Sequence, residues 1–543
     1  MTLTARAALR EEIDVVIAGA GFAGLYMLHK ARSAGLTARV FEAGAGIGGT
    51  WYFNRYPGAR CDVESMEYSY SFDPALEQEW QWTERYATQP EILKYIDHVT
   101  SRYDLRRDVV LETRVTSAIF DETRNRWTVE TDKGDRVTGR YCVMATGCLS
   151  VTNLPPIKGI ESFKKPIYHT GAWPHEGVDF TGLRVGVIGT GSSAIQSIPL
   201  IAEQAKHLTV FQRTPTYSIP AHNRPLSEDE QRAVKAEYPA KRKRALNEGF
   251  AIDMKMSETP AGSVSGAQAN AAFETVWARG GLGFLGAFSD LVLDKAANDM
   301  AAGFLRAKIR GIVKDPKTAA SLAPPQVVGC KRLCVDTNYF ATFNRDNVAL
   351  VDLRETPIEE ITPDGVQTGA SFHGIDALVL ATGFDAITGA LNRIDIRGRK
   401  GERLRDAWAE GPRSYLGLSI AGFPNLFMIA GPGSPSVLTN MMVSIQHHVD
   451  WIAEAMSYLA KRQLATIEPS HAAQDAWVKE VEMVANSTLF PACNSWYVGA
   501  NIPGKPRVFP AYVGFPPYAE KCATVVTNNY EGFTLAPQAT AAE

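Results

Sequence analysis

The 543-residue sequence predicts an α/β protein with two Rossmann-like dinucleotide-binding domains and a helical insertion in the second. Two glycine-rich turns predict these domains, at residues 19–24 and 189–194, each between a short apolar run and a helical pattern. In addition, the sequence Ala-Thr-Gly follows an apolar run twice, at residues 145–147 and 381–383. A buried parallel strand, a glycine turn and a helix together form the unit that cradles a dinucleotide pyrophosphate.

The first glycine turn carries every part of the dinucleotide fingerprint. An apolar strand is expected at residues 13–18, a helix to about residue 33, and a second strand at residues 38–41. Gly19 permits the tight turn, Gly21 lets the backbone approach a pyrophosphate, and Gly24 allows close helix–strand packing. Glu42 ends the second strand and can accept hydrogen bonds from a ribose. We therefore predict a dinucleotide site here.

The second turn reads G-T-G-S-S-A from residue 189 to residue 194, after an expected strand at residues 185–188. Its second strand is expected at residues 208–211 and is followed by Gln212 and Arg213 rather than by an acid. An acid at this position would repel a ribose 2′-phosphate, whereas a guanidinium can bind one. The second unit is therefore expected to prefer NADP to NAD.

Composition excludes several other classes. A formal net charge of −3 gives no argument for a nucleic-acid or anionic-membrane partner. No run of about 18 apolar residues is present, and the N-terminal segment lacks the apolar core of a secretory signal. Seven scattered cysteines make a disulfide framework unexpected and favour a cytoplasmic protein. Cys330 and Cys334, with three residues between them, form neither a C-x-x-C motif nor a zinc half-site.

The two units imply a discontinuous domain organisation. We expect one domain at residues 1–150 and 384–543, a second at residues 151–219 and 328–383, and the helical insertion at residues 220–327. The insertion contains the basic run K-R-K-R at residues 241–244, which we interpret as a solvated helix face. Residues 109–115 and 127–131 alternate in hydropathy and predict strands of a small antiparallel sheet.

Two further motifs accompany the two dinucleotide-binding units. The pattern F-x-G-x-x-x-H-x-x-x-W-P is met except for its glycine, and G-G-x-W-x-x-x-x-Y-P-G-x-x-x-D is met in full at residues 48–62. The matching residues of the first motif are Phe163, His169, Trp173 and Pro174. With both fingerprints, the chain resembles the flavin-dependent (type I) Baeyer–Villiger monooxygenases over almost its whole length. It is most similar to the branch that contains phenylacetone and steroid monooxygenases.

One position departs from the family motif. Lys165 stands where the motif has glycine, and Pro166 follows it. Proline favours extended geometry at the preceding residue, whereas glycine could adopt a positive φ. The connector between the domains is therefore expected to turn differently. His169 is expected to position the two domains rather than to act as a base.

The resemblance implies FAD on the first unit and NADPH on the second. Hydride transfer would reduce the flavin, and the C4a-peroxyflavin formed with O2 would attack a ketone and insert one oxygen beside the carbonyl, giving an ester or lactone. Arg332 matches the family's active-site arginine, and Asp62 matches the carboxylate that orients it. A permanently charged guanidinium suits this role because it can stabilise an oxyanion.

The resemblance also implies the other contacts. For FAD, besides the fingerprint residues Gly19, Gly21, Gly24 and Glu42, these are Thr50, Trp51, Tyr68, Val115 and Met441. For NADP they are Arg60, Cys61, Asp62, Thr190, Gly191, Ser192, Ser193, Gln196, Arg213, Thr214, Lys331, Arg332 and Trp496. The substrate is expected to contact Ser436, Leu438 and Met441. No metal site is expected; the sequence does not specify the ketone, and a monomer is compatible with it.

Three other functions remain open at this point. A flavin monooxygenase that oxidises amine nitrogen or sulfide sulfur would share both fingerprints but lack the pair of Arg332 and Asp62. An NADPH–FAD disulfide reductase would need a cysteine pair close to the flavin, and the sequence has no C-x-x-C motif. A non-enzymatic redox-sensing protein would share the fingerprints and would differ in having no turnover.

Overall fold

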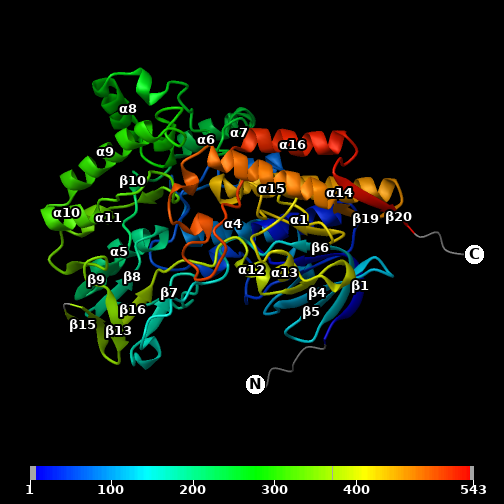
Figure 1. Cartoon of the computed structure of the whole chain (residues 1–543), viewed down its shortest axis with the longest axis horizontal. Coiled ribbons are helices and arrows are strands. Elements are labelled where there is room, and N and C mark those ends of the chain that lie inside the picture. The colour runs from blue at the N-terminus through cyan, green and yellow to red at the C-terminus, as the bar shows by residue number, and fades with distance from the viewer. Residues whose placement is uncertain (1–7, 370, 539–543) are drawn as a thin grey trace, which may run out of the picture.

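The computed structural model describes residues 8–369 and 371–538 and contains two largely parallel sheets, each with its own helices (Figure 1). The larger sheet has the strand order β17-β4-β5-β6-β1-β2-β3, with β18 paired to the end of β6. Its strands are β1 (Arg10–Ala18), β2 (Ala38–Phe41), β3 (Val109–Val110), β4 (Val115–Asp121), β5 (Arg126–Thr131), β6 (Arg136–Met144), β17 (Asp395–Arg397) and β18 (Leu426–Met428).

The expectation of a single strand at residues 109–115 is wrong. β3 ends at Val110 and pairs in parallel with β2, whereas β4 begins at Val115 and pairs antiparallel with β5. Between them Glu112 has a φ of +51°, and its amide donates to the Gly44 carbonyl at 2.9 Å. The chain therefore turns there. The antiparallel strands do not form a separate sheet either, because β5 pairs with β6 and extends the larger sheet.

Helices from both ends of the chain cover the larger sheet. α1 (Phe22–Ser33) joins β1 to β2, and the long helix α14 (Met441–Lys461) packs against it. The C-terminal part of the chain therefore packs against the first glycine-turn unit. The remaining elements of this half are α2 (Thr50–Phe53), α3 (Pro74–Glu79), α4 (Gln89–Arg102), α12 (Gly389–Asn392), α13 (Leu404–Ala407), α15 (His471–Asn486), α16 (Phe515–Thr527), β19 (Leu464–Pro469) and β20 (Phe533–Pro537).

The smaller sheet has the order β12-β9-β8-β16-β7, and all of its pairings are parallel. Its strands are β7 (Ile167–His169), β8 (Arg184–Ile188), β9 (His207–Gln212), β12 (Val348–Asp352) and β16 (Ala377–Leu380). Helix α5 (Ser192–Gln204) follows β8, and α11 (Tyr339–Thr342) packs on α5. A three-stranded antiparallel sheet, β13 (Ile358–Thr362), β14 (Gly365–Thr368) and β15 (Phe372–Gly374), lies between β12 and β16 in sequence. β16 is buried along its whole length, as expected for a covered parallel strand.

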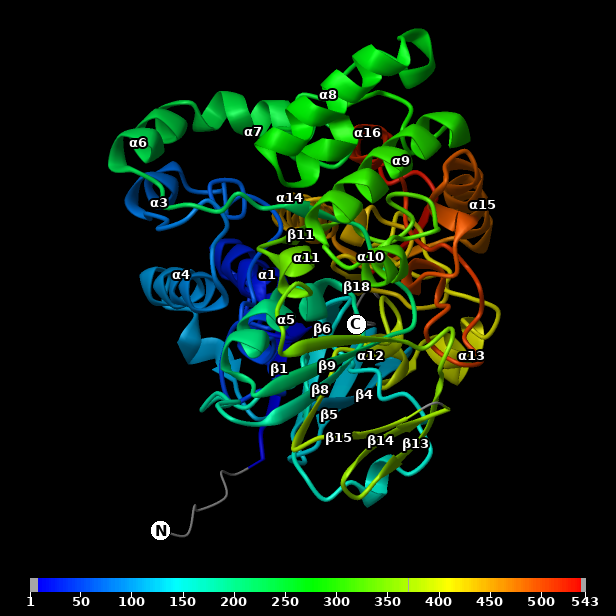
Figure 2. The ribbon, with the colours of Figure 1, turned by 90° about the vertical axis from the view of Figure 1, so that its left-hand side faces the viewer.

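The insertion lies between β10 (Ser218–Pro220) and β11 (Cys334–Asp336), which pair with each other. It therefore leaves and rejoins the second domain at adjacent positions. Figure 2 shows its helices along one end of the molecule, with α6 next to α3 of the first domain. The helices are α6 (Glu228–Ala236), α7 (Tyr238–Leu246), α8 (Gly266–Arg279), α9 (Lys295–Ile312) and α10 (Pro316–Leu322).

Only half of the basic run on α7 is a solvated face, contrary to the sequence interpretation: Lys243 and Arg244 are exposed, whereas Lys241 and Arg242 are partly buried. Lys241 Nζ lies 2.8 Å from a Glu67 carboxylate oxygen, and Arg242 Nε donates to Glu77 at 3.0 Å. Arg242 also donates to the Glu67 carbonyl at 2.9 Å and to Ser69 Oγ at 2.7 Å. These contacts fasten the insertion to the first domain. The sequence could not show this, because the acidic partners lie about 170 residues earlier.

A disulfide joins Cys330 to Cys493, which the cysteine count did not predict. The other five cysteines are free and buried. Cys330 lies on the segment that leads to Arg332, and Cys493 on the segment that leads to Trp496. The bond therefore ties two candidate site segments together. Pairing across 163 residues is set by the tertiary fold and leaves no local spacing signal.

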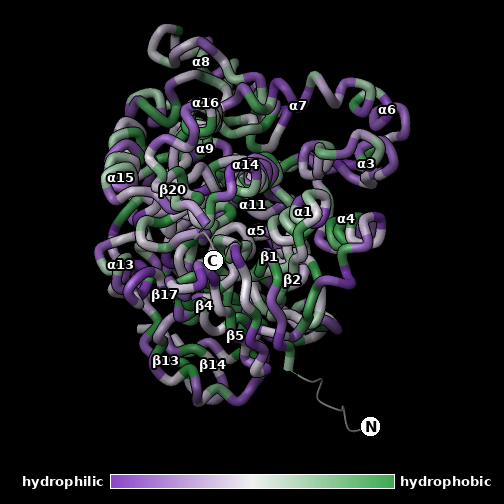
Figure 3. The backbone as a smooth tube through the Cα atoms, turned by 90° about the vertical axis from the view of Figure 1, so that its right-hand side faces the viewer, coloured by the Kyte–Doolittle hydropathy of each residue, from purple (hydrophilic) through white to green (hydrophobic). Residues whose placement is uncertain are grey.

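The hydropathy of the residues matches this arrangement of inner strands and outer helices. Figure 3 shows hydrophobic residues along the inner strands and hydrophilic residues along outer helices such as α3 and α6. Separate apolar clusters fill the two domains and the insertion. Within residues 8–369 and 371–538, no helix is long and apolar enough to cross a membrane.

We expect Arg242→Ala to lower the melting temperature by several degrees. The substitution removes the cation from a Glu77 side chain that is only 9% exposed, and leaving such a group without its partner costs about 1 to 3 kcal/mol. Lys243→Ala is the matched control, because Lys243 is an exposed neighbour on α7. Thermal unfolding followed by circular dichroism should separate the two variants. Equal melting temperatures would show that the contact does not stabilise the protein.

Candidate active site

The first glycine turn brings β1, α1 and β6 into close contact. Gly19 has a φ of +104°, and a Cβ there would lie 2.5 Å from the Ala145 carbonyl oxygen. A Cβ on Gly24 would lie 1.8 Å from the Gly19 carbonyl oxygen. Gly21 precedes α1 and gives it no side-chain cap, so the amides of the first turn can bind a phosphate. The glycines are thus required by space as well as by conformation.

Glu42 lies beside this turn. Its carboxylate accepts hydrogen bonds from the Ala20 amide at 2.8 Å and the Gly44 amide at 2.7 Å. Burial raises its pKa, and the two amide hydrogen bonds oppose that shift. A carboxylate has about four lone-pair sites, so Glu42 retains acceptor capacity for a ribose hydroxyl. The residues of this turn therefore fit a dinucleotide.

The other residues predicted to contact FAD come from three elements. Thr50 and Trp51 begin α2, Val115 begins β4 and Met441 begins α14. The Trp51 indole donates to the Tyr68 hydroxyl at 3.2 Å, which holds the two rings edge to face. A Cβ on Gly21 would lie 3.5 Å from the Gly49 Cα, so the loop that carries Thr50 adjoins the first glycine turn.

The second glycine turn repeats this geometry. Gly189 has a φ of +114°, and a Cβ there would lie 2.3 Å from the Ala381 carbonyl oxygen. Gly191 precedes α5, provides no side-chain cap and has open space beside it. Hydrogen bonds hold the side chains around this turn in place. Thr190 donates to the Thr214 carbonyl at 2.9 Å. Ser192 Oγ lies 3.1 Å from Cys334 Sγ, and Ser193 Oγ lies 3.1 Å from Thr170 Oγ1.

Gln196 connects the two domains. Its Oε1 accepts from the Tyr56 hydroxyl at 2.8 Å, and its Nε2 donates to the Arg60 carbonyl at 3.1 Å. Arg60 itself pairs with Glu84 at 3.1 Å. The neighbouring Cys61 is buried, and burial raises its thiol pKa. The loop predicted to serve both cofactors therefore lies against α5 of the second domain.

Two cations lie together near the second strand of this unit. Burial lowers the pKa of Lys331, and the positive charge of Arg213 lowers it further. Neither side chain forms an ion pair with any residue that the structure describes. Gln212, at the position where an acid would bind a ribose hydroxyl, is buried and donates to the Ser321 carbonyl at 2.8 Å. Two adjacent cations without a nearby acid fit a phosphate monoester.

Arg332 and Asp62 form the central ion pair. Arg332 Nε donates to Asp62 Oδ2, and Arg332 Nη2 donates to Asp62 Oδ1 at 2.9 Å. Arg332 Nη1 donates to the Val437 carbonyl at 2.6 Å. Burial would lower the Arg332 pKa, but the charge and hydrogen bonds of Asp62 outweigh it, and the pKa is raised above its ordinary value. The guanidinium is therefore fixed in place and charged.

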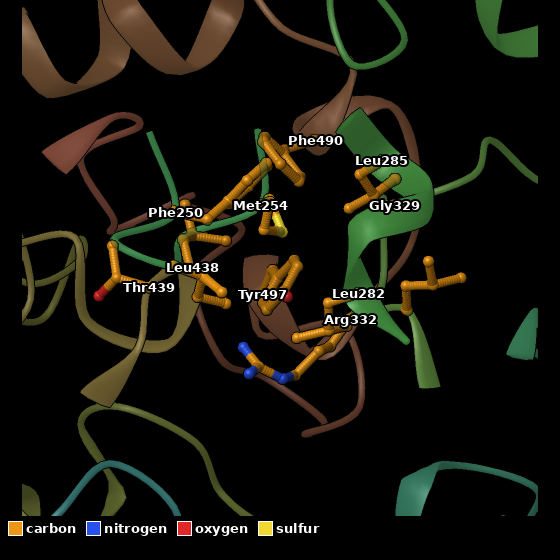
Figure 4. A pocket seen from close by; sticks show the side chains of 12 residues that line it. Phe250, Met254, Leu282, Leu285, Gly329, Arg332, Leu438, Thr439, Phe490 and Tyr497 are labelled. Atoms are coloured by element: carbon orange, nitrogen blue, oxygen red, sulfur yellow. The ribbon is translucent and has the colours of Figure 1, made fainter. Parts of the chain in front are cut away.

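A small cavity of about 40 Å³ adjoins this pair (Figure 4). Its wall is mostly apolar, and the side chains come from the insertion, the loop before α14 and the C-terminal segment. The lining residues are Phe250, Ile252, Met254, Leu282, Leu285, Gly329, Arg332, Leu333, Leu438, Thr439, Phe490 and Tyr497.

Only one of the three expected substrate residues lines this cavity. Leu438 does so, whereas Ser436 is buried with its hydroxyl 3.3 Å from the Ala430 carbonyl, and Met441 packs into adjacent apolar clusters. Sequence reasoning missed the insertion's contribution to the wall. Phe250, Ile252 and Met254 alternate along the chain, the pattern of a segment with one buried face, but this pattern does not say what that face contacts.

Trp496 lies on a second cavity of about 320 Å³, between residues 385–412 and 496–510. Its ring centroid is 4.3 Å from that of Tyr497, which lines both cavities. Lys505 Nζ binds Asp385 at 2.6 Å and the Ala386 carbonyl at 2.7 Å across the second cavity's wall. The C-terminal segment is thereby held against the connection between the two domains.

His169 holds the connectors together rather than facing a reacting group. Its Nδ1 accepts from the Gly171 amide at 2.9 Å, and its Nε2 lies 3.3 Å from Thr382 Oγ1. Burial lowers its pKa, which favours the neutral ring. Lys165 does not have a positive φ, and the Pro166 carbonyl accepts from Leu378 as the chain enters β7. The family-motif segment is therefore part of the second sheet.

The fold and the site define a class: a protein with two dinucleotide sites and an arginine–carboxylate pair between them. Residues 16–255 match the family model described as pyridine nucleotide-disulphide oxidoreductase. A Baeyer-Villiger monooxygenase of Pseudooceanicola batsensis is 43% identical and covers 96% of this chain and 95% of its own. A phenazine N-monooxygenase of Lysobacter antibioticus is 43% identical, with 97% of each chain covered.

Comparison with solved structures leads to the same class of protein. The oxidized steroid monooxygenase bound to NADP superposes with a TM-score of 0.93 at 51% identity, covering 97% of this chain and 99% of the other. The chain belongs to the Baeyer–Villiger monooxygenase family. Members of this family are flavin-dependent oxidoreductases that use NADPH and incorporate one oxygen atom of O2. The fold and cofactor predictions are confirmed by these relatives.

We expect Arg213→Ala to raise the KM for NADPH roughly 10- to 100-fold and to leave kcat within about twofold. The lost contact would be to the 2′-phosphate, which is remote from the carbon that transfers hydride. The KM for NADH should not change. Steady-state NADPH and NADH oxidation measures both constants, and Arg310→Ala, an exposed arginine on α9, is the control. Equal increases for the two nucleotides would refute a 2′-phosphate contact.

Proposed function

We propose that this protein oxidises a ketone to an ester or lactone with FAD, NADPH and O2. The observation that carries the proposal is the guanidinium of Arg332, held by Asp62 at the wall of an apolar cavity. The domain boundaries, the cytoplasmic location and the roles of the individual site residues remain predictions. Oxygenation of amine nitrogen or sulfide sulfur is the alternative function, and product analysis distinguishes it from ketone oxidation.

The residues present fit both cofactors. FAD would lie on the first glycine turn, with Glu42 as the acceptor for its ribose. NADPH would lie on the second turn, with Arg213 and Lys331 at its 2′-phosphate. When bound, FAD supplies the activation of O2 that no amino-acid side chain can supply. The protein's own residues bind, orient and enclose the reactants.

Arg332 is suited to stabilise negative charge on the ketone oxygen. Its planar head has five N–H donors, and the contacts with Asp62 and Val437 use three of them. One N–H on each terminal nitrogen therefore remains for a substrate or an oxygen atom. Asp62 keeps the guanidinium from rotating, so little reorganisation is needed as charge develops. Such a donor in a dry site contributes about 2.7 to 4 kcal/mol.

The cavity restricts the substrate to apolar ketones. Of its lining side chains, only those of Arg332, Thr439 and Tyr497 carry an oxygen or nitrogen atom. The apolar walls exclude water, which strengthens the electrostatic effect of Arg332. Phe490 and Leu285 line the cavity, so their size helps to set the size of the ketone that is accepted.

We expect the purified holoprotein to be yellow and to convert at least one apolar ketone to an ester with NADPH. A panel of linear, cyclic and aromatic ketones, analysed by gas chromatography with mass detection under ¹⁸O2, tests this. One ¹⁸O atom should appear in each ester. Phenazines, tertiary amines and sulfides should be included in the panel. Formation of N- or S-oxides without any ester would support the alternative function.

We expect Arg332→Ala to keep flavin reduction by NADPH and to lower ester formation at least roughly 100-fold. Stopped-flow bleaching of the flavin measures the first step, and product yield measures the second. Asp62→Asn is the companion variant, because it keeps the size of the side chain and one acceptor oxygen but removes the charge and the second acceptor. It should give an intermediate loss. Ester formation near the wild-type rate in Arg332→Ala would disprove the assigned role.

A further inference from the structure

Tyr497 lies on the wall of the cavity beside Arg332. It belongs to the short turn Trp496–Val498 and is only 3% exposed. Figure 4 shows its ring next to the Arg332 guanidinium, with the apolar residues Met254 and Phe490 farther away on the same wall. Tyr497 belongs to the C-terminal segment, whereas Arg332 follows the insertion in the sequence. The sequence analysis assigned no role to Tyr497.

The hydroxyl of Tyr497 has no other function in the fold. Among the described residues, no hydrogen bond to this hydroxyl is found, although the Tyr497 backbone amide donates to Ser495 Oγ at 3.2 Å. Three other tyrosines have hydroxyls that are fully enclosed and unpaired, but the Tyr497 hydroxyl is not among those enclosed atoms. The Tyr497 oxygen is therefore not sealed in the protein, and the ring that carries it lies beside Arg332 in Figure 4.

The remaining polar side chain of the cavity is already engaged. Thr439 Oγ1 donates to the Ser436 carbonyl at 3.0 Å and lies 2.6 Å from Ser444 Oγ. Its oxygen points away from the cavity centre in Figure 4. Arg332 and Tyr497 are therefore the two side chains that can donate a hydrogen bond into the cavity.

We propose that the Tyr497 hydroxyl donates the second hydrogen bond to the ketone oxygen, beside that of Arg332. This inference rests on the proposed ketone oxidation. A carbonyl oxygen accepts two hydrogen bonds, and it needs them most when attack on the carbonyl carbon gives it negative charge. A phenol is a suitable neutral donor, because it adds no second positive charge next to the guanidinium.

Tyr497 remains a donor throughout the working pH range. Burial raises the pKa of its hydroxyl, while the Arg332 charge acts in the opposite direction, and the result lies above the ordinary value. The disulfide at Cys493 and the tilted contact between the Trp496 and Tyr497 rings restrict the segment that carries the phenol. The hydroxyl is thus positioned before the substrate arrives, which limits the entropy lost on binding.

The test is Tyr497→Phe, which removes the hydroxyl and keeps the ring. We expect kcat/KM for a ketone to fall roughly 10- to 100-fold. The rate of flavin reduction by NADPH should stay within twofold, and more NADPH should be consumed per ester formed. Oxidation of thioanisole, a sulfide with no carbonyl oxygen, should stay within twofold. Tyr339→Phe is the matched control, because it removes an unpaired hydroxyl in the second domain.

Three results would overturn the inference. Ketone oxidation within twofold of wild type would show that the hydroxyl does not contact the substrate. An equal fall in ketone oxidation, sulfide oxidation and flavin reduction would show that Tyr497 acts only through packing. A wild-type protein that forms no ester from any ketone would disprove the proposed function itself, and that outcome is recognised before the variant is assayed.

Discussion

The ion pair between Asp62 and Arg332 is the constraint on which the rest of the structure depends. Its two residues are 270 positions apart, and each comes from a loop that only a complete fold brings into place. Taking both charges out of water is costly unless the geometry is good, and the paired hydrogen bonds supply that geometry. Around it, the protein must hold two nucleotide domains, an insertion and a C-terminal segment in a single arrangement.

That arrangement is maintained by contacts between domains. Gln196 of α5 binds the loop at Tyr56 and Arg60, and the pairing of β10 with β11 returns the chain from the insertion close to Arg332. The basic residues of α7 fix the insertion onto the first domain. Polar contacts of this kind fix the orientation of the parts as well as stabilising them, because each must satisfy specific donors and acceptors. They explain why residues from three distant parts of the chain can line one cavity.

The C-terminal segment closes the site from the other side. Its disulfide, the ion pair of Lys505 with Asp385 and the hydrogen bond from Asn501 to the Phe384 carbonyl attach it to the connection between the domains. Trp496 and Tyr497 are thereby placed on the partition between the small and the large cavity. Movement of this segment would change both cavities together, so access of a substrate and enclosure of the site are physically linked.

The sequence by itself determined the parts that depend on local geometry. Gly19, Gly24 and Gly189 are required because a Cβ at each would collide with backbone, and this need is visible as a spaced glycine pattern. The strand at residues 38–41 was predicted with its correct ends, since apolar runs mark buried parallel strands. The pairing of Arg332 with Asp62 was inferred from family motifs rather than from spacing, and the structure brings the two residues together.

Only the tertiary structure decided the contacts between segments that are distant in the sequence. It placed Lys241 and Arg242 on acidic partners, joined Cys330 to Cys493, and left Ser436 outside the cavity while bringing Tyr497 to its wall. Each of these facts is a contact between segments more than 100 residues apart in sequence, or follows from one. Charge, burial and hydrogen-bonding partners at such positions depend on what lies opposite, and no local pattern of residues carries that information.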